Sequence, residues 1–160
     1  MYKDKSIIHI VCMDELGGIG KDNKLLFNIP EDLQYFRNKT LGNVCLCGRK
    51  TYESFHKPLK RRIVKWISKH WEDDLVKGLD VCETYSNSLN TNSIYVIGGA
   101  SIYNQTSDIA DELLITIVDA KVEADAFYNI PKGFVKVWEG DTQHSVNGLS
   151  FKHSEWKRED

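Results

Sequence analysis

The chain has 160 residues, of which 21 are basic and 23 acidic, so its formal net charge is −2. This length suits one domain with a substantial core, and we expect a single domain over residues 1–160. The balanced charge, with no large basic tail or cluster, argues against nucleic-acid binding as the main function.

No long apolar run follows the first charged residues, so we expect neither a signal peptide nor a transmembrane helix. The four cysteines are Cys12, Cys45, Cys47 and Cys82. Three of them lie in apolar, strand-like runs, and no second pair or histidine cluster is spaced to complete a metal site. We therefore expect no metal, and free buried thiols in a protein of the reducing cytoplasm.

The first strand is predicted over residues 6–13 (SIIHIVCM), a short and nearly continuous run of β-branched residues. We interpret its one histidine, His9, as a structural residue. The loop GGIG follows at residues 17–20. Its glycines permit unusual backbone angles and the close approach of a ligand.

A helix is predicted over about residues 30–41, because Pro30 suits the first helical position and Gly42 is a plausible C-terminal cap. Its first turn carries Asp32, which shares a face with the large apolar side chains of Leu33 and Phe36. A carboxylate on an apolar face beside a glycine loop outlines a small-molecule site. Acidic residues are also common in a first turn simply because they complement the helix dipole, and the segment alone favours that interpretation.

Strands and helices alternate through the middle of the chain. We predict strands over residues 43–47, 62–67, 79–84 and 94–97, a short helix that reaches about residue 55, and a helix over about residues 100–106. Residues 85–93 (YSNSLNTNS) are polar and predict at most one helical turn. In two places a strand runs into a glycine turn at a helix start, which suits anion binding: Gly48-Arg49-Lys50-Thr51 and Gly98-Gly99-Ala100-Ser101.

A further strand is predicted over residues 112–118 (ELLITIV), with Thr116 as its polar interior residue. Residues 135–143 and 149–157 alternate around Asn147-Gly148, which marks a hairpin turn. Together the elements predict an α/β fold, in which flanking helices cover a single, mostly parallel central sheet with an antiparallel C-terminal hairpin. Ligands of such sheets bind at the carboxyl ends of the strands.

The order of these segments resembles the dihydrofolate reductase family. The matching landmarks cover residues from about 6 to 128 and are, in chain order, IVCMDELGGIGKDNKLLFNIPEDLQYF, CGRKTYESF, PLKRR, YVIGGASIYNQ and LLITIVDAKVEADAF. Five motifs in the right order are far more specific than any one of them, and they move Asp32 from a structural to a functional interpretation. The resemblance implies NADPH-dependent reduction of 7,8-dihydrofolate to 5,6,7,8-tetrahydrofolate by hydride transfer, and hence a role in one-carbon metabolism and thymidylate synthesis.

The same resemblance implies the residues that bind the substrate. Asp32 is similar to the carboxylate that accepts hydrogen bonds from the pteridine, and Thr116 to the hydroxyl that holds this carboxylate. The implied catalytic residues are Asp32, Thr116 and Leu25. The other implied substrate contacts are four apolar side chains, two backbone carbonyls and one arginine for a carboxylate of the substrate, which are Leu33, Phe36, Phe55, Leu59, Ile10, Ile97 and Arg62.

For the cofactor, NADPH, the resemblance implies three groups of residues. Those near the nicotinamide are Cys12, Ile19, Gly20 and Tyr103. Those of the two phosphate turns are Arg49, Lys50, Thr51, Gly98, Gly99, Ala100, Ser101 and Ile102. Ser68 and Lys69 fall where the family binds the 2′-phosphate. A cation at this position attracts that phosphate and so favours NADPH over NADH. We expect a cytoplasmic monomer that binds dihydrofolate and antifolate inhibitors, and neither a membrane nor a nucleic acid.

The chain departs from the family in several places. Leu26 and Phe27 stand where the family usually has Pro-Trp, so the indole N–H is lost. The basic residue often found at the position of Ser101 is missing. The helix expected before Ile94 is cut down to residues 85–93, which predicts a compact, divergent enzyme. The register of the strand around Lys65 stays open by one residue.

Two alternatives remain beside an active dihydrofolate reductase. One is a related pyrimidine reductase of the same fold, as in riboflavin synthesis, against which Asp32 in its IPEDLQYF setting argues. The other is a nucleotide-binding structural or regulatory protein that has lost turnover. The intact set of Asp32, Thr116, Gly98 and Gly99 argues against the second alternative.

Overall fold

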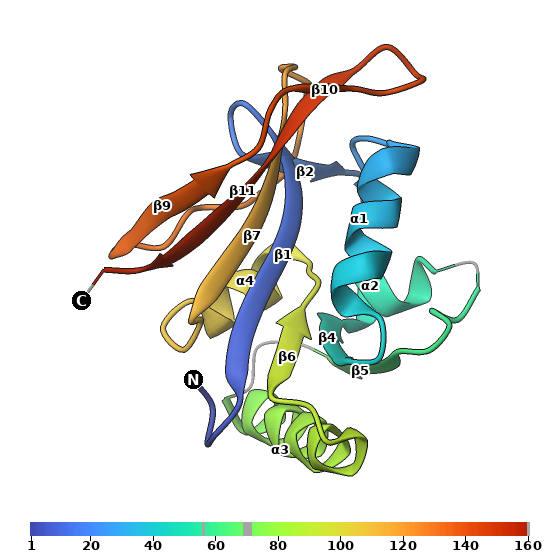
Figure 1. Ribbon diagram of the computed structural model, residues 1–160. Helices are drawn as coiled ribbons and strands as arrows, with labels where there is room; N and C mark the ends of the chain where they lie inside the picture. The colour runs from blue at the N-terminus through green and yellow to red at the C-terminus, as the bar shows by residue number, and fades with distance from the viewer. Residues whose placement is uncertain (56, 69–71, 160) are drawn as a thin grey trace.

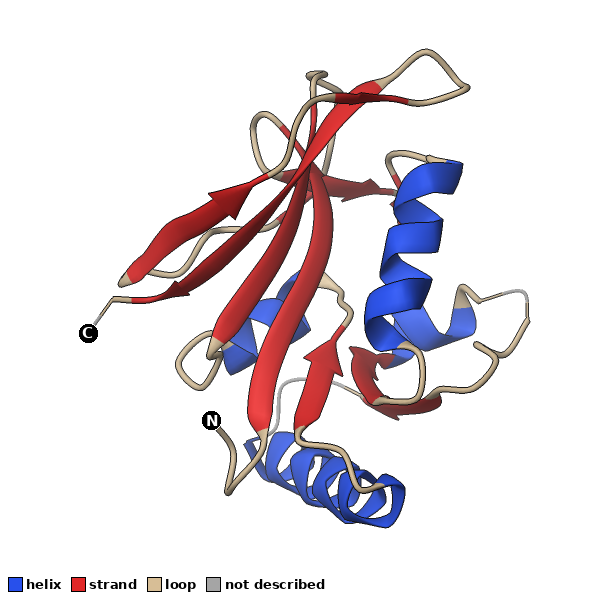
Figure 2. Ribbon diagram, viewed as in Figure 1, coloured by secondary structure: helices blue, strands red, loops and turns tan. Residues whose placement is uncertain are grey.

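The computed structural model describes residues 1–55, 57–68 and 72–159. Within these residues the chain forms a large mixed sheet of eight strands, a small sheet of three strands, and four helices (Figures 1 and 2). This arrangement confirms the α/β class. In the part of the chain that is described, no helix combines the length and the apolar character needed to cross a bilayer.

The elements alternate along the chain as the sequence indicates. Those of the first half are β1 (Ser6–Asp14), β2 (Gly18–Lys21), β3 (Lys24–Leu25), α1 (Pro30–Thr40), β4 (Val44–Gly48), α2 (Arg49–Glu53) and β5 (Ile63–Ile67). Those of the second half are α3 (Glu72–Leu89), β6 (Ser93–Val96), α4 (Ala100–Thr106), β7 (Glu112–Val118), β8 (Ala126–Phe127), β9 (Phe134–Glu139), β10 (Gln143–His144) and β11 (Ser150–Arg158).

The large sheet has the order β10-β11-β7-β1-β6-β4-β5, and β9 also pairs with β11. The strands from β7 to β5 run parallel, whereas β11 is antiparallel to β7, β9 and β10. The mostly parallel sheet and its antiparallel C-terminal part are therefore confirmed. Pairing of Val44 with Ile63 fixes the register of β5, which the sequence leaves open.

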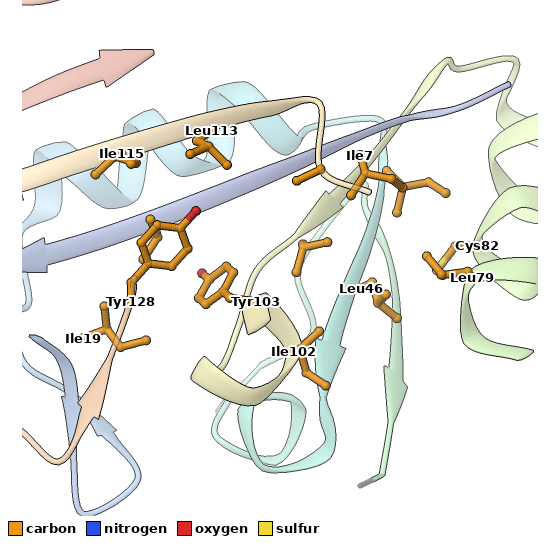
Figure 3. Packing of buried hydrophobic residues seen from close by; sticks show 14 of the residues in the cluster. Ile7, Ile19, Leu46, Leu79, Cys82, Ile102, Tyr103, Leu113, Ile115 and Tyr128 are labelled. Carbon is orange, nitrogen blue, oxygen red and sulfur yellow. The ribbon is translucent and has the colours of Figure 1, made fainter. Parts of the chain in front are cut away.

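Both faces of the sheet are apolar because β1 lies at its centre, between β6 and β7. Ile7 and Val11 belong to the larger core, which α3 and α4 cover with side chains such as Leu79 and Ile102 (Figure 3). Ile8 and Ile10 of β1 belong to a smaller cluster on the other side, against which Tyr35 and Phe36 of α1 pack. The site described below lies at this second face.

His9 is a structural residue, as the sequence indicates. It is fully buried, and its ring nitrogens lie 3.0 Å from the hydroxyl of Tyr128 and 2.8 Å from that of Thr106. Both nitrogens are thus satisfied within the core. Burial, with a smaller contribution from Arg158, lowers the pKa of His9 to about 4.

The strand predicted over residues 79–84 is wrong, because this segment lies inside the 18-residue helix α3. Leu75, Leu79, Cys82 and Ser86 are spaced by four, three and four residues, which places them on one helical face, and the last three are buried. The polar stretch at residues 85–93 hides this period, since Ser86 is buried while its hydroxyl bonds to the carbonyl of Thr91 at 2.9 Å. The helix before β6 is α3, which has 18 residues, so the predicted shortening of this helix is also wrong.

The C-terminal hairpin is broken on its first side. The single strand predicted over residues 135–143 is divided into β9 and β10 around Gly140. A Cβ at Gly140 would lie 2.9 Å from the indole of Trp138, so a larger residue would clash at the point where β9 ends. The predicted turn at Asn147-Gly148 is confirmed, and Gly148 has a φ of +88°.

Candidate functional site

A cleft opens beside the start of α1. Its walls come from β1, the small sheet, the segment before α1 and the first turn of α1. The lining residues are Cys12, Ile19, Leu25, Leu26, Phe27, Ile29, Asp32 and Leu33. Five residues that the sequence analysis assigns to substrate, cofactor or catalysis are therefore together here: Cys12, Ile19, Leu25, Asp32 and Leu33.

Local sequence explains why Asp32 points into an apolar cleft. Pro30 begins α1, and Ile29 before it is 2% exposed, which anchors the entry of the chain into the helix. Asp32 follows in the first turn, where its side chain is 16% exposed. Ile29 is the N-cap residue of α1, and its side chain forms no capping hydrogen bond. The carboxylates of the first turn therefore lie at the positive end of the helix dipole.

The carboxylate of Asp32 interacts with two groups from neighbouring strands, the hydroxyl of Thr116 on β7 and the thiol of Cys12 on β1. Burial raises the pKa of Asp32, while these two donor groups act in the opposite direction. Cys12 and Thr116 are opposite each other in the β1–β7 register, which explains why both reach the same carboxylate. The pairing of Thr116 with Asp32 stays a prediction, which the effect of Thr116 on the pKa of this carboxyl supports.

The thiol of Cys12 is protonated in this setting. Burial raises its pKa well above the ordinary value, and the neighbouring Asp32 adds to the rise. The resemblance implies only that Cys12 lies near the nicotinamide, whereas its side chain also interacts with Asp32. The apolar run around Cys12 gives no signal for this role, because the pairing depends on where α1 packs.

His153 is a residue of the site that the sequence analysis misses. It lies on β11 opposite Thr116, and its Nδ1 atom is 2.7 Å from Thr116 Oγ1 and 3.9 Å from Asp32 Oδ1. The signal was present in the alternation of the last strand, where Phe151 and His153 are buried and Lys152 between them is exposed. A histidine on the inner face of a strand beside a functional threonine is a candidate for a role in the site.

The glycine loop is more ordered than the sequence predicts. Most of the loop predicted at residues 17–20 lies in β2, which pairs with β3 and also with β8 from a distant part of the chain. Asp14, fully buried at the end of β1, holds this region by accepting the N–H groups of Leu16, Gly18 and Val122 at 2.8–3.0 Å. Burial acts to raise the pKa of Asp14, but the N–H donors outweigh it and the pKa is lowered.

Gly18 is required where the small sheet meets Asp14. A Cβ at this position would lie 2.9 Å from that of Ala124 and 3.1 Å from Asp14 Oδ1. Leu25 on β3 is 77% exposed at the rim of the cleft. Having no titratable group, Leu25 can exclude water but cannot transfer a proton.

The predicted apolar contacts are only partly brought together. Leu33 lines the cleft and is 51% exposed, while Phe36 packs against the cluster of Ile8, Ile10 and Leu114. Phe55 and Leu59 are half-buried in the segment between α2 and β5, outside the lining of the cleft. Ile97 is half-buried just after β6.

Arg62 is held in place before β5. Its Nε donates to the carbonyl of Lys60 at 3.0 Å, its Nη1 to Thr40 Oγ1 at 3.4 Å, and its guanidinium lies 5.9 Å from the ring centre of Phe36. No carboxylate among residues 1–55, 57–68 and 74–159 forms an ion pair with it. Burial lowers the pKa of Arg62, which marks a cation that is poorly solvated and able to take an anionic ligand.

The two glycine turns are joined directly. The N–H of Gly48 donates to the carbonyl of Gly98 at 2.8 Å, so the starts of α2 and α4 are adjacent. Gly98 has a φ of +119°, and the Gly98–Gly99 peptide bond is cis. Neither helix start has a side-chain cap. The backbone N–H groups there are consequently available to an anion.

The side chains around these turns differ in their state. Arg49 is exposed and donates to Glu53 at 2.8 Å, while Lys50 is exposed and Thr51 half-buried. Ser101 is exposed and Ala100 half-buried, whereas Ile102 is buried in the main core. Ser68 is half-buried after β5, and Lys69 lies outside the described residues.

Tyr103 links the cofactor side to β1. Its buried hydroxyl donates a 2.6 Å hydrogen bond to the carbonyl of Ile10. One of the two predicted pteridine-binding carbonyls therefore already has a partner, and a carbonyl oxygen keeps a second lone pair for another donor. Ile19 is buried and Gly20 pairs with Leu25 in the small sheet.

Comparison with known proteins gives a consistent result. A family model described as dihydrofolate reductase matches residues 6–158. The chain is 34% identical over 112 residues to a dihydrofolate reductase of Haemophilus influenzae, with 69% of this chain and 70% of the relative covered. It is 34% identical over 126 residues to one of Bacillus subtilis (76% and 74% covered), and 37% identical over 115 residues to one of Neisseria meningitidis (69% and 70% covered).

The match extends from β1 to the end of β11 and so includes every element that forms the site. It decides between the two enzyme alternatives of the sequence analysis and disfavours the pyrimidine reductase. The sequence resemblance is thereby confirmed, and the chain belongs to the dihydrofolate reductase family.

Proposed function

We propose that this chain reduces 7,8-dihydrofolate to 5,6,7,8-tetrahydrofolate with NADPH. The observation that carries the proposal is the buried carboxylate of Asp32, held by two donors on the apolar wall of a cleft, in a chain that belongs to the dihydrofolate reductase family. NADPH, when bound, supplies the hydride. The protein binds and orients the pteridine, excludes water and favours positive charge on the ring.

Asp32 performs the polar part of this task. An ionised carboxylate has only acceptor sites, and it matches the 2-amino group and the N3 position of the pteridine, which are donors. Thr116 and Cys12 occupy part of its acceptor capacity, so the remaining lone pairs point toward the cleft. Its low-dielectric surroundings strengthen its attraction to the charge that develops on the ring. The proton that reaches N5 of the pteridine is supplied by water.

The rest of the substrate matches the surroundings of α1. Leu33, Phe36, Phe55 and Leu59 provide apolar surface, and the carbonyls of Ile10 and Ile97 accept from the pteridine edge. The guanidinium of Arg62 binds a carboxylate of the glutamate tail in a bidentate manner. Its lack of an acidic partner within the described chain supports this role. Antifolates with a donor-rich ring would bind the same groups.

NADPH fits the two joined turns. Uncapped N–H groups at the starts of α2 and α4 suit its phosphates, together with the side chains of Arg49, Lys50, Thr51 and Ser101. Gly98, Gly99, Ala100 and Ile102 form the second turn, and Cys12, Ile19, Gly20 and Tyr103 would face the nicotinamide. Ser68, with Lys69, would bind the 2′-phosphate.

We extend the proposal to a cytoplasmic monomer with one domain over residues 1–160. The four cysteines are free, and three of them, Cys45, Cys47 and Cys82, are buried. Buried free thiols are typical of proteins in a reducing compartment. Sedimentation of the purified chain tests the monomer.

The oxidation of NADPH by the purified protein in the presence of dihydrofolate tests the activity. Asp32→Asn should lower kcat by about 100-fold or more, because it removes the charge that stabilises the reacting ring. The affinity for NADPH should stay within about twofold, since Asp32 is separate from both glycine turns. A loss of NADPH binding in this variant would identify Asp32 as a structural cap. Binding of NADPH without turnover in the unmodified protein would instead favour a regulatory protein.

A further inference from the structure

His153 is placed to act on the site through Thr116. Its Nδ1 atom lies 2.7 Å from Thr116 Oγ1, which is a short hydrogen bond, and 3.9 Å from Asp32 Oδ1, which is too long for one. The side chain is 7% exposed. Contact with the carboxylate is therefore indirect and runs through the threonine hydroxyl.

The imidazole has little freedom to move. It stacks on the ring of Tyr35 with centroids 3.7 Å apart and planes within 10°, and its edge meets Phe151 at 5.4 Å. Antiparallel pairing of β11 with β7 sets His153 directly opposite Thr116. Helix α1 and two strands thus fix the position of Nδ1.

The count of hydrogens determines which way these bonds run. Thr116 has one hydroxyl hydrogen, and its interaction with Asp32 lowers the pKa of this carboxyl as a donor does, so we assign that hydrogen to the carboxylate, which can only accept when it is ionised. The 2.7 Å contact between Thr116 and His153 then requires a hydrogen on Nδ1 of the imidazole. The result is a chain of two hydrogen bonds in the same direction, from His153 to Thr116 to Asp32, in which each bond polarises the next.

We propose that His153 is a positioning residue of the reductase, whose Nδ1–H directs the Thr116 hydroxyl at Asp32 and so keeps this carboxylate ionised for the pteridine. The effect on the pteridine rests on the proposed function, whereas the hydrogen bond from His153 to Thr116 is a property of the free protein. The donor, His153, lies on β11, the last strand of the chain.

The charged surroundings of His153 agree with a neutral donor. Lys39 on α1 and Glu155 on β11 form an ion pair of 3.7 Å, and Asp32 and Tyr35 also lie beside the imidazole. Burial, with a smaller contribution from Lys39, lowers the pKa of His153 to about 4. The ring is therefore uncharged near neutral pH, and it acts through its hydrogen bond and not through its charge.

The first measurement is the tautomer of His153 in the unmodified protein, from the nitrogen chemical shifts of labelled histidine. We expect the hydrogen on Nδ1. A hydrogen on Nε2 with a bare Nδ1 would overturn the proposal, because Thr116 would then have to donate to His153. This result does not depend on any variant that might fail to fold.

The second measurement is the pKa of the Asp32 carboxyl, followed by carbon NMR in two variants. His153→Phe keeps the stacking on Tyr35 but removes the donor, and it should raise the pKa by about 0.5–1 unit. His153→Asn can place an amide N–H near the position of Nδ1, and it should recover at least half of that shift. His144→Phe, a change on the same hairpin at an exposed residue, should leave the pKa unchanged.

Kinetics separates this proposal from the proposed function. With an active enzyme, His153→Phe should raise KM for dihydrofolate several-fold, while the Kd for NADPH is unchanged and His153→Asn is closer to the unmodified protein. Equal Asp32 pKa values in the unmodified protein and His153→Phe would overturn the positioning role, whatever the activity. If no form of the protein reduces dihydrofolate, the proposed function fails, whereas the tautomer and the pKa still decide the role of His153.

Discussion

The hydroxyl of Ser145 donates a 2.7 Å hydrogen bond to Oε1 of Glu31, although 114 residues separate them in the chain. The N–H of Val146 donates to the other oxygen of this carboxylate at 3.2 Å. The side chain of Asn147 in turn donates to the carbonyl of Asn28 at 2.7 Å. The turn between β10 and β11 is therefore fastened to the start of α1, one residue before Asp32.

Ser145→Ala should loosen this connection. The bond from Ser145 is the main reason that the pKa of Glu31 lies below its usual value, so the pKa should rise in the variant. Amide exchange of Val146 should accelerate roughly three- to tenfold, because its acceptor is then held less firmly. Both are measurable by NMR. Ser150→Ala, which removes a hydroxyl bonded to His144 in the same hairpin, is the control and should change neither quantity.

Asp32→Asn should make the protein more stable at pH 7. Burial raises the pKa of Asp32 in the folded state, so folding disfavours its charged form at every pH above the unfolded pKa. Removing the charge should increase the free energy of unfolding by about 0.5–2 kcal/mol, as at other functional sites. The gain should disappear as the pH falls below about 4, where the carboxyl of Asp32 is neutral in both the folded and the unfolded chain. Urea denaturation at both pH values measures it.

The exposed carboxylate of Asp108 supplies the control for this prediction. Asp108→Asn should leave the stability within about 0.5 kcal/mol. A less stable Asp32→Asn protein at pH 7 would mean that the bonds from Thr116 and Cys12 outweigh the cost of burial.

Acid should destabilise the protein through its buried histidines. The pKa of His9 falls from 6.5 to about 4 on folding, because burial disfavours the imidazolium. The unfolded chain therefore binds a proton first, and the stability is complete above pH 6.5 and declines as the pH falls toward 4. His9 should contribute at most about 3 kcal/mol to this loss.

His9→Gln tests the assignment, since glutamine can meet the hydroxyls of Tyr128 and Thr106 without titrating. Its free energy of unfolding should depend less steeply on pH between 6.5 and 4 than that of the unmodified protein. An unchanged slope would assign the acid sensitivity to other groups, of which His153 is the first to examine.

Gly78→Ala should destabilise the protein, although alanine is normally the better helix former. A Cβ at Gly78 would lie 2.4 Å from Cγ2 of Ile67, so α3 could not keep its distance from β5. The expected loss is about 1–3 kcal/mol, as for other over-packed positions. Ser88→Ala, at an exposed position of the same helix, should be neutral or slightly stabilising. Thermal or urea unfolding compares the two.

Most of the large sheet could be predicted from the sequence because its strands are buried on both faces. The runs around Ile8, Leu46 and Leu114 are continuous and apolar, and the glycine turns mark where strands end. The segment 79–84 (LDVCET) instead mixes three apolar residues with three polar ones, and over six residues a half-buried strand and one face of a helix give similar patterns. Only the longer period from Leu75 to Ser86 separates them.

The site was harder to predict than the fold because its partners come from distant parts of the chain. Asp32 and Thr116 are accessible to reasoning from motifs, whereas the stacking of Tyr35 on His153 depends on how α1 packs against β11. The small sheet is similar, since β2 and β8 have four and two residues and are separated by more than a hundred positions. Pairing of such short segments is decided by tertiary contacts, which a local pattern does not contain.

The last strand of the large sheet has a consequence for incomplete chains. Between Glu112 and Val118, β7 is bonded along one edge by β1 and along the other by β11. A product that ends before β11 would still contain Asp32 and Thr116, but it would expose the full length of that second edge. Unpaired strand edges recruit strands of other molecules. Products that end before Ser150 should therefore aggregate as well as lack activity, because β11 must be present before this edge of β7 is covered.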